Sequence, residues 1–195
     1  MKKLLPTLLA LLLFCLALPC ASAADVTPSP QKLSVDGTDA DCDKYNIDGS
    51  NYFKLRDLAY LLSKSDSRFS VAFDAESNAV TVVPGGDYVP VGGELERGKD
   101  LSKTAVASKQ SVLINGEAVE GISVYNIGGN NYFKLRDLGS ALGFTVAFDA
   151  DANTAVVLSK GSKATYQNAF ETLLGSVNEK RRTDMASEVT FDGFE

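Results

Sequence analysis

The chain has 195 residues, a formal net charge of −6 and no histidine. The absence of histidine excludes histidine-dependent catalytic triads, histidine metal ligands and histidine pH switches. An acidic chain without a basic cluster is also unsuited to nucleic acid, because that recognition depends on Lys and Arg side chains that neutralise phosphates. We therefore expect no nucleic-acid partner.

The first 23 residues have the pattern of a secretory signal peptide. Lys2 and Lys3 precede an apolar stretch at residues 4–18, and the small residues at 21–23 form a cleavage signal. The apolar stretch is shorter than the roughly 20 residues that a membrane span needs. We therefore predict a signal peptide at residues 1–23 that is removed from the mature protein.

Cleavage near Ala24 predicts a secreted or cell-surface protein with no membrane span after cleavage. Only Cys42 lies beyond the leader, so no internal disulfide is expected. We interpret Cys42 as a small, partly buried residue. The alternatives for the leader are a retained anchor and a lipoprotein lipidated at Cys20, although Pro19 stands where lipidation needs a small residue.

An internal duplication organises the rest of the chain. Residues 45–58 read YNIDGSNYFKLRDL and residues 125–138 read YNIGGNNYFKLRDL. The match resumes with FSVAFDA at residues 69–75 and FTVAFDA at residues 144–150. The first copy carries five extra residues around 63–68. Each copy is therefore about 50 residues long.

The first copy predicts, in chain order, a strand, a hairpin, a helix and a second hairpin. The expected elements are a strand at 33–35, a hairpin of strands 45–47 and 50–55 around Asp48-Gly49, a helix with Leu55, Leu58 and Leu62 on one face, and strands at 69–73 and 79–83. The second copy repeats this series from a strand at 112–114 to a helix that Gly143 ends. Without that glycine, the first helix is expected to run on or fray through residues 63–67. Residues 88–91 could add an edge strand.

These elements predict an α+β fold made of two small modules. Each module is expected to be an antiparallel β-sheet packed on one short helix, in the order β-β-β-α-β-β. We place module 1 at residues 31–91, a linker at 92–109 and module 2 at 110–160. The two modules should pack together or on the linker, because a 50-residue unit without disulfides is marginal alone. Residues 161–195 are predicted to form a tail with a C-terminal helix over about 164–181.

The repeated motif resembles the copper amine oxidase N-terminal-like (stalk) domain family. The resemblance rests on Val-x-Asn/Asp-Gly, then Tyr-Asn-Ile-x-Gly-x-Asn-Tyr-Phe-Lys-Leu-Arg-Asp-Leu, then Val-Ala-Phe-Asp, over residues 31–91 and 110–159. It implies an exported or surface protein of a Gram-positive bacterium that serves as a spacer or binding module. The oxidase cofactor motif has an acidic residue after Asn-Tyr, where this chain has Phe53 and Phe133. We therefore expect no cofactor and no amine oxidase activity.

Two turns carry oxygen-bearing side chains at the spacing of a calcium loop. They are Asp74, Glu76 and Asn78 in the first copy, and Asp149, Asp151 and Asn153 in the second. In the second turn Thr154 and Lys160 stand where a calcium loop needs glycine and glutamate. We therefore interpret both segments as hairpin turns held by side-chain hydrogen bonds to the backbone, and we expect no metal site.

The pairs Arg56-Asp57 and Arg136-Asp137 begin the two predicted helices. We interpret them as structural, because Asp is favourable at the positive helix N-terminus and Arg can hold a carbonyl or the preceding strand. A charged binding pair is the alternative.

The tyrosines of the hairpin define the candidate binding surface. Tyr45, Ile47 and Tyr52 fall on one sheet face, opposite Phe53 and Leu55. One helix covers only one face, so the tyrosine face either packs against the other module or forms a ligand platform. The candidate ligand-binding residues are these tyrosines and their polar neighbours, namely Tyr45, Asn51, Tyr52, Lys54, Tyr125, Asn131, Tyr132 and Lys134.

The sequence therefore favours a non-catalytic extracellular tandem module. Its expected role is to bind cell-wall glycan or another surface protein, or to space another domain from the cell envelope. The alternative is an N-terminal accessory region of a larger surface enzyme whose catalytic domain lies outside this chain. A small hydrolase of unrecognised type is a third interpretation, disfavoured because no acid lies in a recognisable catalytic motif.

Overall fold

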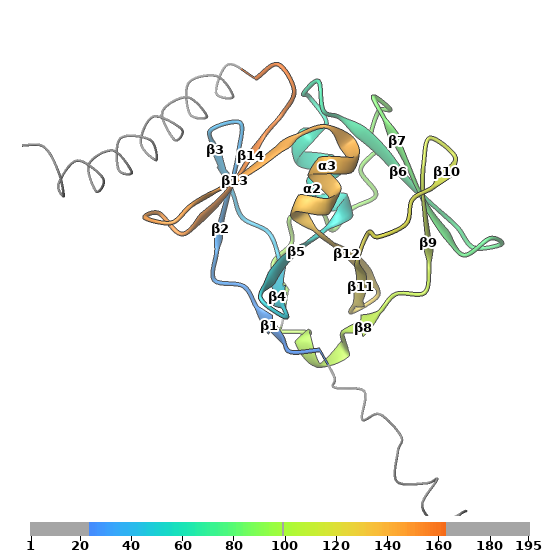
Figure 1. Ribbon diagram of the computed structural model, residues 1–195, viewed down its shortest axis with the longest axis horizontal. Helices are drawn as coiled ribbons and strands as arrows, with labels where there is room; N and C mark the ends of the chain where they lie inside the picture. Colours follow the sequence, from blue (N-terminus) through green and yellow to red (C-terminus); the bar gives the residue numbers. More distant parts are fainter. Residues whose placement is uncertain (1–23, 99, 163–195) are drawn as a thin grey trace, which may run out of the picture.

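The computed structural model describes residues 24–98 and 100–162 of the chain. The predicted signal peptide and the predicted C-terminal helix both lie outside the described residues. The described part forms three β-sheets and two eight-residue α-helices (Figure 1). None of the helices in this part has the length and apolar character needed to cross a membrane.

The two repeats produce matching series of elements. The first repeat forms β1 (Val26–Pro28), β2 (Lys32–Val35), β3 (Thr38–Ala40), β4 (Lys44–Ile47), β5 (Ser50–Lys54), α2 (Leu55–Leu62), β6 (Phe69–Asp74) and β7 (Ala79–Pro84). The second forms the 3-10 helix η1 (Ser102–Thr104), β8 (Val106–Ala107), β9 (Ser111–Ile114), β10 (Glu117–Ala118), β11 (Val124–Ile127), β12 (Asn130–Lys134), α3 (Leu135–Leu142), β13 (Thr145–Asp149) and β14 (Thr154–Leu158). The predicted strands and helices of the first copy are thus present, whereas residues 88–91 form no strand.

The turns follow local sequence. Asp48 and Gly49 both have positive φ angles, 48° and 79°, as a two-residue type I′ hairpin requires. Helix α3 ends as predicted at Gly143, whose φ is 79° and whose N–H donates to the Gly139 carbonyl. Helix α2 does not run on: it ends at Leu62, and the extra residues that follow form turns.

The predicted arrangement, two modules that each hold an antiparallel sheet on one helix, is wrong. Strand β7 of the first repeat pairs with β9 of the second, and β14 of the second repeat pairs with β2 of the first. Both pairings are parallel and complete four-stranded sheets, in the orders β10-β9-β7-β6 and β13-β14-β2-β3. The repeats have therefore exchanged hairpins, and every sheet contains strands of both.

The physical reason for this difference is that β2 and β9 offer the same kind of partner. Each is a four-residue strand, Lys32–Val35 or Ser111–Ile114, with apolar residues to align against a neighbouring strand. The edge strand of a hairpin from either repeat can therefore pair with β2 or with β9, that is, with the strand of its own repeat or with that of the other. Composition does not distinguish the two pairings, and the structure uses the exchanged one.

The third sheet joins the repeats directly. Its order is β1-β4-β5-β12-β11-β8, so β5 and β12 meet at its centre. They are antiparallel, with Phe53 opposite Phe133, Tyr52 opposite Lys134 and Lys54 opposite Tyr132. This register is symmetric about the phenylalanine pair, and a pseudo-two-fold axis relating the repeats passes between the two rings.

The main core lies where the three sheets surround the helices. Figure 1 shows α2 and α3 in the middle of the molecule, between the two four-stranded sheets and above the central sheet. Leu58 and Leu138 of these helices and Phe53 and Phe133 of the central sheet have no exposed surface. Cys42 is also buried in this core, and burial raises the pKa of its thiol to about 12. One apolar core thus serves both repeats.

Candidate functional site

The tyrosines singled out by sequence form a second core beneath the central sheet. Tyr45 packs edge-to-face on Tyr132 with ring centroids 5.2 Å apart, and Tyr52 packs in the same way on Tyr125 at 5.4 Å. Each pair joins the two repeats. Of the two alternatives for the tyrosine face, these contacts correspond to packing between copies.

Polar partners also hold these tyrosines in place. The Leu101 N–H donates to the Tyr45 hydroxyl at 3.1 Å, and the Tyr52 hydroxyl donates to Ser123 Oγ at 2.9 Å. Burial raises the pKa of Tyr45 and Tyr132, which keeps both phenols neutral. Only 3% of Tyr45 and 5% of Tyr52 is exposed, and little surface is available for a ligand.

The candidate asparagines lie on the opposite face of the central sheet, where each starts a short chain of amides. Asn51 Nδ2 donates to Gln31 Oε1 at 2.9 Å, and Asn131 Nδ2 donates to Gln110 Oε1 at 2.6 Å. Asn126 extends the second chain by donating to Asn131 Oδ1 at 3.3 Å. Each repeat thus presents a ladder of half-buried amides at one end of the sheet.

Each amide ladder forms one wall of a groove, and the other repeat supplies the opposite wall. Groove 1 is lined by Arg56, Val71 and Phe73 of the first repeat and by Gln110, Asn126 and Asn131 of the second. Groove 2 is lined by Arg136, Val146 and Phe148 of the second repeat and by Gln31, Ser50 and Asn51 of the first. The two grooves are therefore equivalent under the pseudo-two-fold axis, and strand exchange creates both.

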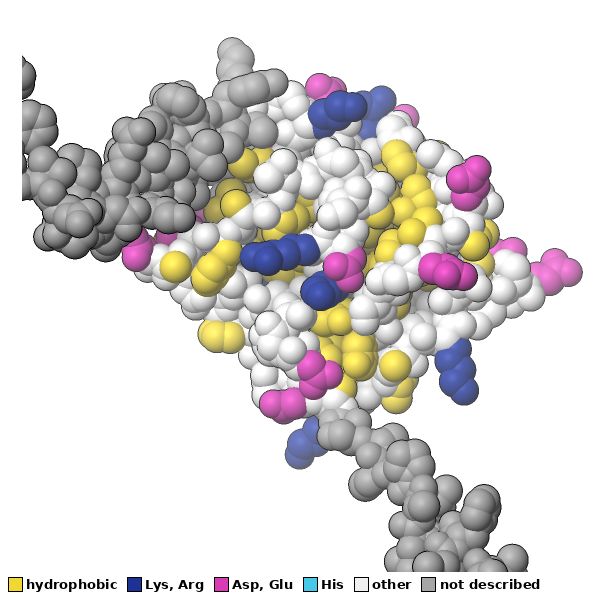
Figure 2. Space-filling view, in the orientation of Figure 1, with side chains coloured by type: hydrophobic (Ala, Val, Ile, Leu, Met, Phe, Trp, Pro, Cys, Tyr) yellow, Lys and Arg dark blue, Asp and Glu magenta, His cyan; other side chains and the backbone are white. Residues whose placement is uncertain are grey.

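The grooves combine an aromatic ring, amides and a cation. Phe73 is 49% exposed and Phe148 is 44% exposed, so the same large apolar side chain is left in solvent in both grooves. The arginine that begins each helix is also exposed. Figure 2 shows cationic, acidic and hydrophobic side chains gathered on the front of the molecule, over the start of α3.

The arginines do not have the structural role that the sequence predicted. Neither Arg56 nor Arg136 forms an ion pair or side-chain hydrogen bond with another residue of the described chain. The buried acid Asp57 pairs instead with Lys54, at 3.0 Å. Lys54 is itself buried, whereas its equivalent Lys134 is half-buried. The guanidinium groups are thus available to a ligand.

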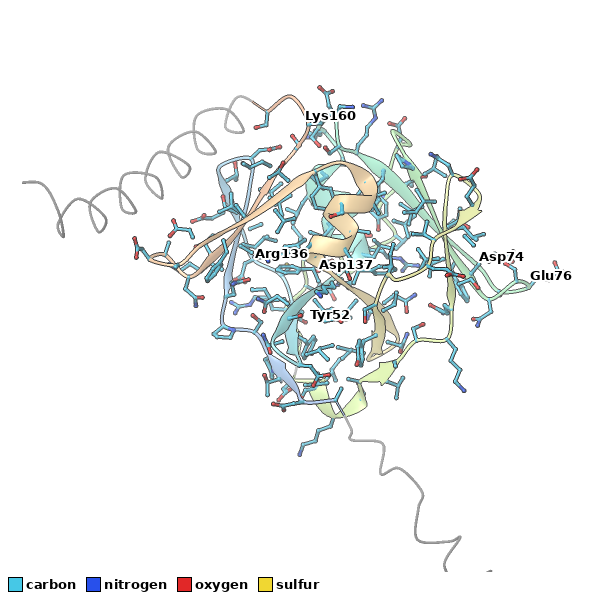
Figure 3. The ribbon with its side chains drawn as sticks, viewed as in Figure 1. Tyr52, Asp74, Glu76, Arg136, Asp137 and Lys160 are labelled. Carbon is cyan, nitrogen blue, oxygen red and sulfur yellow. The ribbon has the colours of Figure 1, made fainter. Side chains whose placement is uncertain are left out.

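The acidic turns behave as hairpin turns, as interpreted. Asp74 accepts hydrogen bonds from the Glu76 N–H at 2.9 Å and the Ser77 hydroxyl at 2.6 Å, and these bonds lower the pKa of its carboxyl. In the second copy Asp149 accepts from the Ala152 N–H at 3.0 Å. In Figure 3 Asp74 and Glu76 lie at the far tip of the β6–β7 hairpin, away from the arginine of groove 2. Among residues 24–98 and 100–162, no three His, Cys, Asp or Glu side chains lie close enough to hold a metal ion.

The phenylalanines and glutamines of the grooves are not among the candidate residues that the sequence predicts. Element lengths carry a signal for the phenylalanines. An eight-residue helix is about 12 Å long, whereas a six-residue strand spans about 20 Å. Strand β6 therefore extends beyond helix α2, which covers it. Phe73, near the end of β6, is left exposed. No equivalent signal marks Gln31 or Gln110.

The fold defines a tandem-repeat protein with two grooves in corresponding positions, one on each side of a pseudo-two-fold axis. Comparison of the chain with protein-family models, with curated proteins and with solved structures gives no match.

Proposed function

We propose that the chain is a non-catalytic extracellular module that binds a cell-envelope glycan in its two grooves. The observation that carries this proposal is the duplicated constellation of an exposed phenylalanine, an amide ladder and an arginine. Its occurrence twice, in equivalent positions built from both repeats, is better explained by binding than by packing, since neither phenylalanine completes the core.

The wall chemistry suits a sugar chain. The apolar C–H face of a pyranose ring can stack on Phe73 or Phe148, while its hydroxyl and acetamido groups face the opposite wall. Asn and Gln amides can both donate and accept there, and few precisely placed polar groups are enough to orient a ligand. No hydrogen-bond partner for Gln31 Nε2 or Gln110 Nε2 is found within the described chain, which leaves both amide donors for a ligand.

The arginines favour an acidic glycan over a neutral one as the ligand. A guanidinium group binds a carboxylate or phosphate through two parallel hydrogen bonds. Arg56 and Arg136 place this group at the edge of each groove, on a chain whose net charge is −6. Sugar polymers with carboxylate or phosphate substituents, as in bacterial cell walls, match this arrangement. The predicted signal peptide and the stalk-domain resemblance support a location at the cell envelope.

A sedimentation assay with purified peptidoglycan tests the proposal. The unsubstituted protein should co-sediment above the level of an unrelated acidic protein, and the double variant F73A/F148A should lose at least about tenfold in affinity. Tyr60→Ala is the matched control, because Tyr60 is an exposed aromatic residue that lines neither groove. Retention of the unsubstituted protein no greater than that of the unrelated protein would contradict the proposal.

The stoichiometry provides a second readout. Titration of a soluble cell-wall oligosaccharide by calorimetry should give two sites per chain, because each groove has an exposed phenylalanine, an arginine and amide side chains. Each single variant, F73A or F148A, should leave one. A single site that neither substitution affects would place the ligand elsewhere.

A further inference from the structure

The two repeats carry the same charged residues at the start of each helix, but their surroundings differ. In the first repeat, residues 88–95, which we call the strap, cross the start of α2. The Lys54 Nζ donates to the Gly93 carbonyl at 2.8 Å, and the Leu95 N–H donates to Asp57 Oδ1 at 3.1 Å. A lysine and an aspartate three residues apart thus hold one carbonyl and one N–H of an extended segment.

Apolar contacts with the main core and hydrogen bonds within the strap also hold the strap in place. Tyr88 is buried in the main core, and Leu95 packs against it. Between them, the Glu94 carboxylate accepts hydrogen bonds from the Tyr88 hydroxyl at 2.6 Å and from the Val91 N–H at 2.9 Å. The strap therefore presents its backbone to Lys54 and Asp57 in a fixed conformation.

In the second repeat the equivalent lysine and aspartate, which we call the cradle, are Lys134 and Asp137. Both are half-buried, while Lys54 is 8% exposed and Asp57 is fully buried. No ion pair joins Lys134 to Asp137, and no other residue of 24–98 or 100–162 donates or accepts a side-chain hydrogen bond there. Figure 3 shows Asp137 beside Arg136 at the front of the molecule, where α3 begins.

The size of the two grooves agrees with this difference. Groove 2 includes Asp137 in its lining and has a volume of about 440 Å³. Groove 1 stops short of Asp57 and has a volume of about 170 Å³. Among residues 24–98 and 100–162, none hydrogen-bonds to Lys134 and Asp137 in the second repeat as the strap does to Lys54 and Asp57 in the first.

We infer that the cradle binds an extended polypeptide segment of a partner protein, in the way that the first repeat binds the strap. The segment would place a backbone carbonyl on Lys134. Two residues further on, an apolar residue would donate its backbone N–H to the Asp137 carboxylate, as Leu95 does to Asp57. The cation and the anion are complementary to these two backbone dipoles in that order. Within this chain the same residue pair already binds such a segment, which favours a polypeptide over other occupants. The inference goes beyond glycan binding and uses neither the phenylalanines nor the amide ladders.

The test is an NMR titration of the full, isotope-labelled chain with a synthetic peptide of residues 87–96, DYVPVGGELE. We expect saturable shifts of backbone signals at Lys134–Leu138 and an affinity in the submillimolar range. Asp137→Asn and Lys134→Gln should each weaken binding at least about tenfold while preserving the dispersed spectrum of a folded chain. Asp151→Asn, an exposed acid in the β13–β14 turn that does not line groove 2, is the control and should bind normally.

Three results would overturn the inference: no saturable shift, shifts confined to the start of α2, or equal affinity for a scrambled peptide. The readout is separable from glycan binding. Phe73→Ala should weaken glycan binding in groove 1 and leave the peptide affinity unchanged, because Phe73 does not line groove 2. Asp137→Asn should weaken peptide binding, while groove 1, which lacks Asp137, still retains the chain on peptidoglycan.

Discussion

Phe53 lies directly opposite Phe133 at the centre of the six-stranded sheet, and neither side chain has any exposed surface. Each phenylalanine comes from a different repeat. The two rings belong to one core, which also contains the buried leucines of α2 and α3. The repeats are therefore one folding unit, in which each half completes the sheets of the other.

Removal of either central ring should destabilise the whole molecule. Phe53→Ala or Phe133→Ala should lower the free energy of unfolding by about 3–5 kcal/mol, because a fully buried ring is lost and a cavity remains. Urea unfolding followed by both tyrosine fluorescence and circular dichroism should show one shared transition. Phe73→Ala, at an exposed position, is the control and should change stability by less than about 0.5 kcal/mol. Two separate transitions would contradict a shared core.

The tyrosine hydroxyls should contribute to stability and not to ligand binding. Tyr52→Phe removes the hydrogen bond to Ser123 Oγ and should cost about 1 kcal/mol. Retention on peptidoglycan should stay at the unsubstituted level, since Tyr52 is almost fully buried. A loss of retention without a loss of stability would show that this face is the binding surface.

Gly139→Ala should destabilise the chain although it lies within helix α3. In an exposed helix the change would stabilise by about 1 kcal/mol. Here the added Cβ would lie 2.9 Å from the Phe144 carbonyl oxygen and 2.9 Å from Val146 Cγ2, so the backbone must shift. We expect a loss of about 1–3 kcal/mol by chemical denaturation. The first repeat has Ala59 at this position, where the extra residues after α2 lengthen the connection to β6. A gain in stability for Gly139→Ala would contradict the close packing of β13 on α3.

Because Glu94 is hydrogen-bonded within the strap, its titration should make the free energy of unfolding vary with pH in the acidic range. Its hydrogen bonds to Tyr88 and Val91 favour the carboxylate and lower the pKa of Glu94 from 4.5 to about 2. A lowered pKa in the folded state means that the stabilisation is complete above the ordinary pKa and is lost as the pH falls toward about 2. Glu94→Gln should therefore lose less stability than the unsubstituted chain between about pH 5 and about pH 2.5. Glu96→Gln, a control at an exposed neighbouring residue, should retain the full pH dependence of the free energy of unfolding. If this dependence is the same in the unsubstituted chain and in both variants, Glu94 does not stabilise the fold through the strap.

Local structure was predictable because it depends on residues close in sequence. The leucine spacing in residues 55–62 and 135–142, the Asp48-Gly49 turn and the Gly143 helix end each produce the expected element. The division of the central hairpin into a tyrosine face and a phenylalanine face also follows from strand alternation, and the two faces enter two different cores.

The exchange of hairpins was not predictable, because the alternatives have the same apolar pattern. Val80 pairs with Val112 of the other repeat, and the equivalent Ala155 pairs with Leu33. A pairing of Val80 with Leu33 within the first repeat would bury similar side chains. Duplication makes the two solutions nearly equal in composition, so only the three-dimensional course of the connections decides between them.

The candidate site was predicted only in part for the same reason. Asn51 and Asn131 were selected and line the grooves, but each faces a phenylalanine and an arginine of the other repeat. Each groove exists only because the repeats exchange hairpins, so the pattern of a single repeat cannot predict which residues line it. The tyrosines were selected for exposure on a face that the other repeat covers.

The measurement that tests the account most directly is the set of long-range backbone nuclear Overhauser contacts of β7 in the isotope-labelled chain. Parallel pairing across the repeats predicts contacts from Val80 to Val112 and from Val82 to Ile114, with equivalent contacts from Ala155 to Leu33. Contacts from Val80 to Leu33, with none to Val112, would show that each repeat keeps its own hairpin and would contradict both the exchanged fold and the grooves built on it.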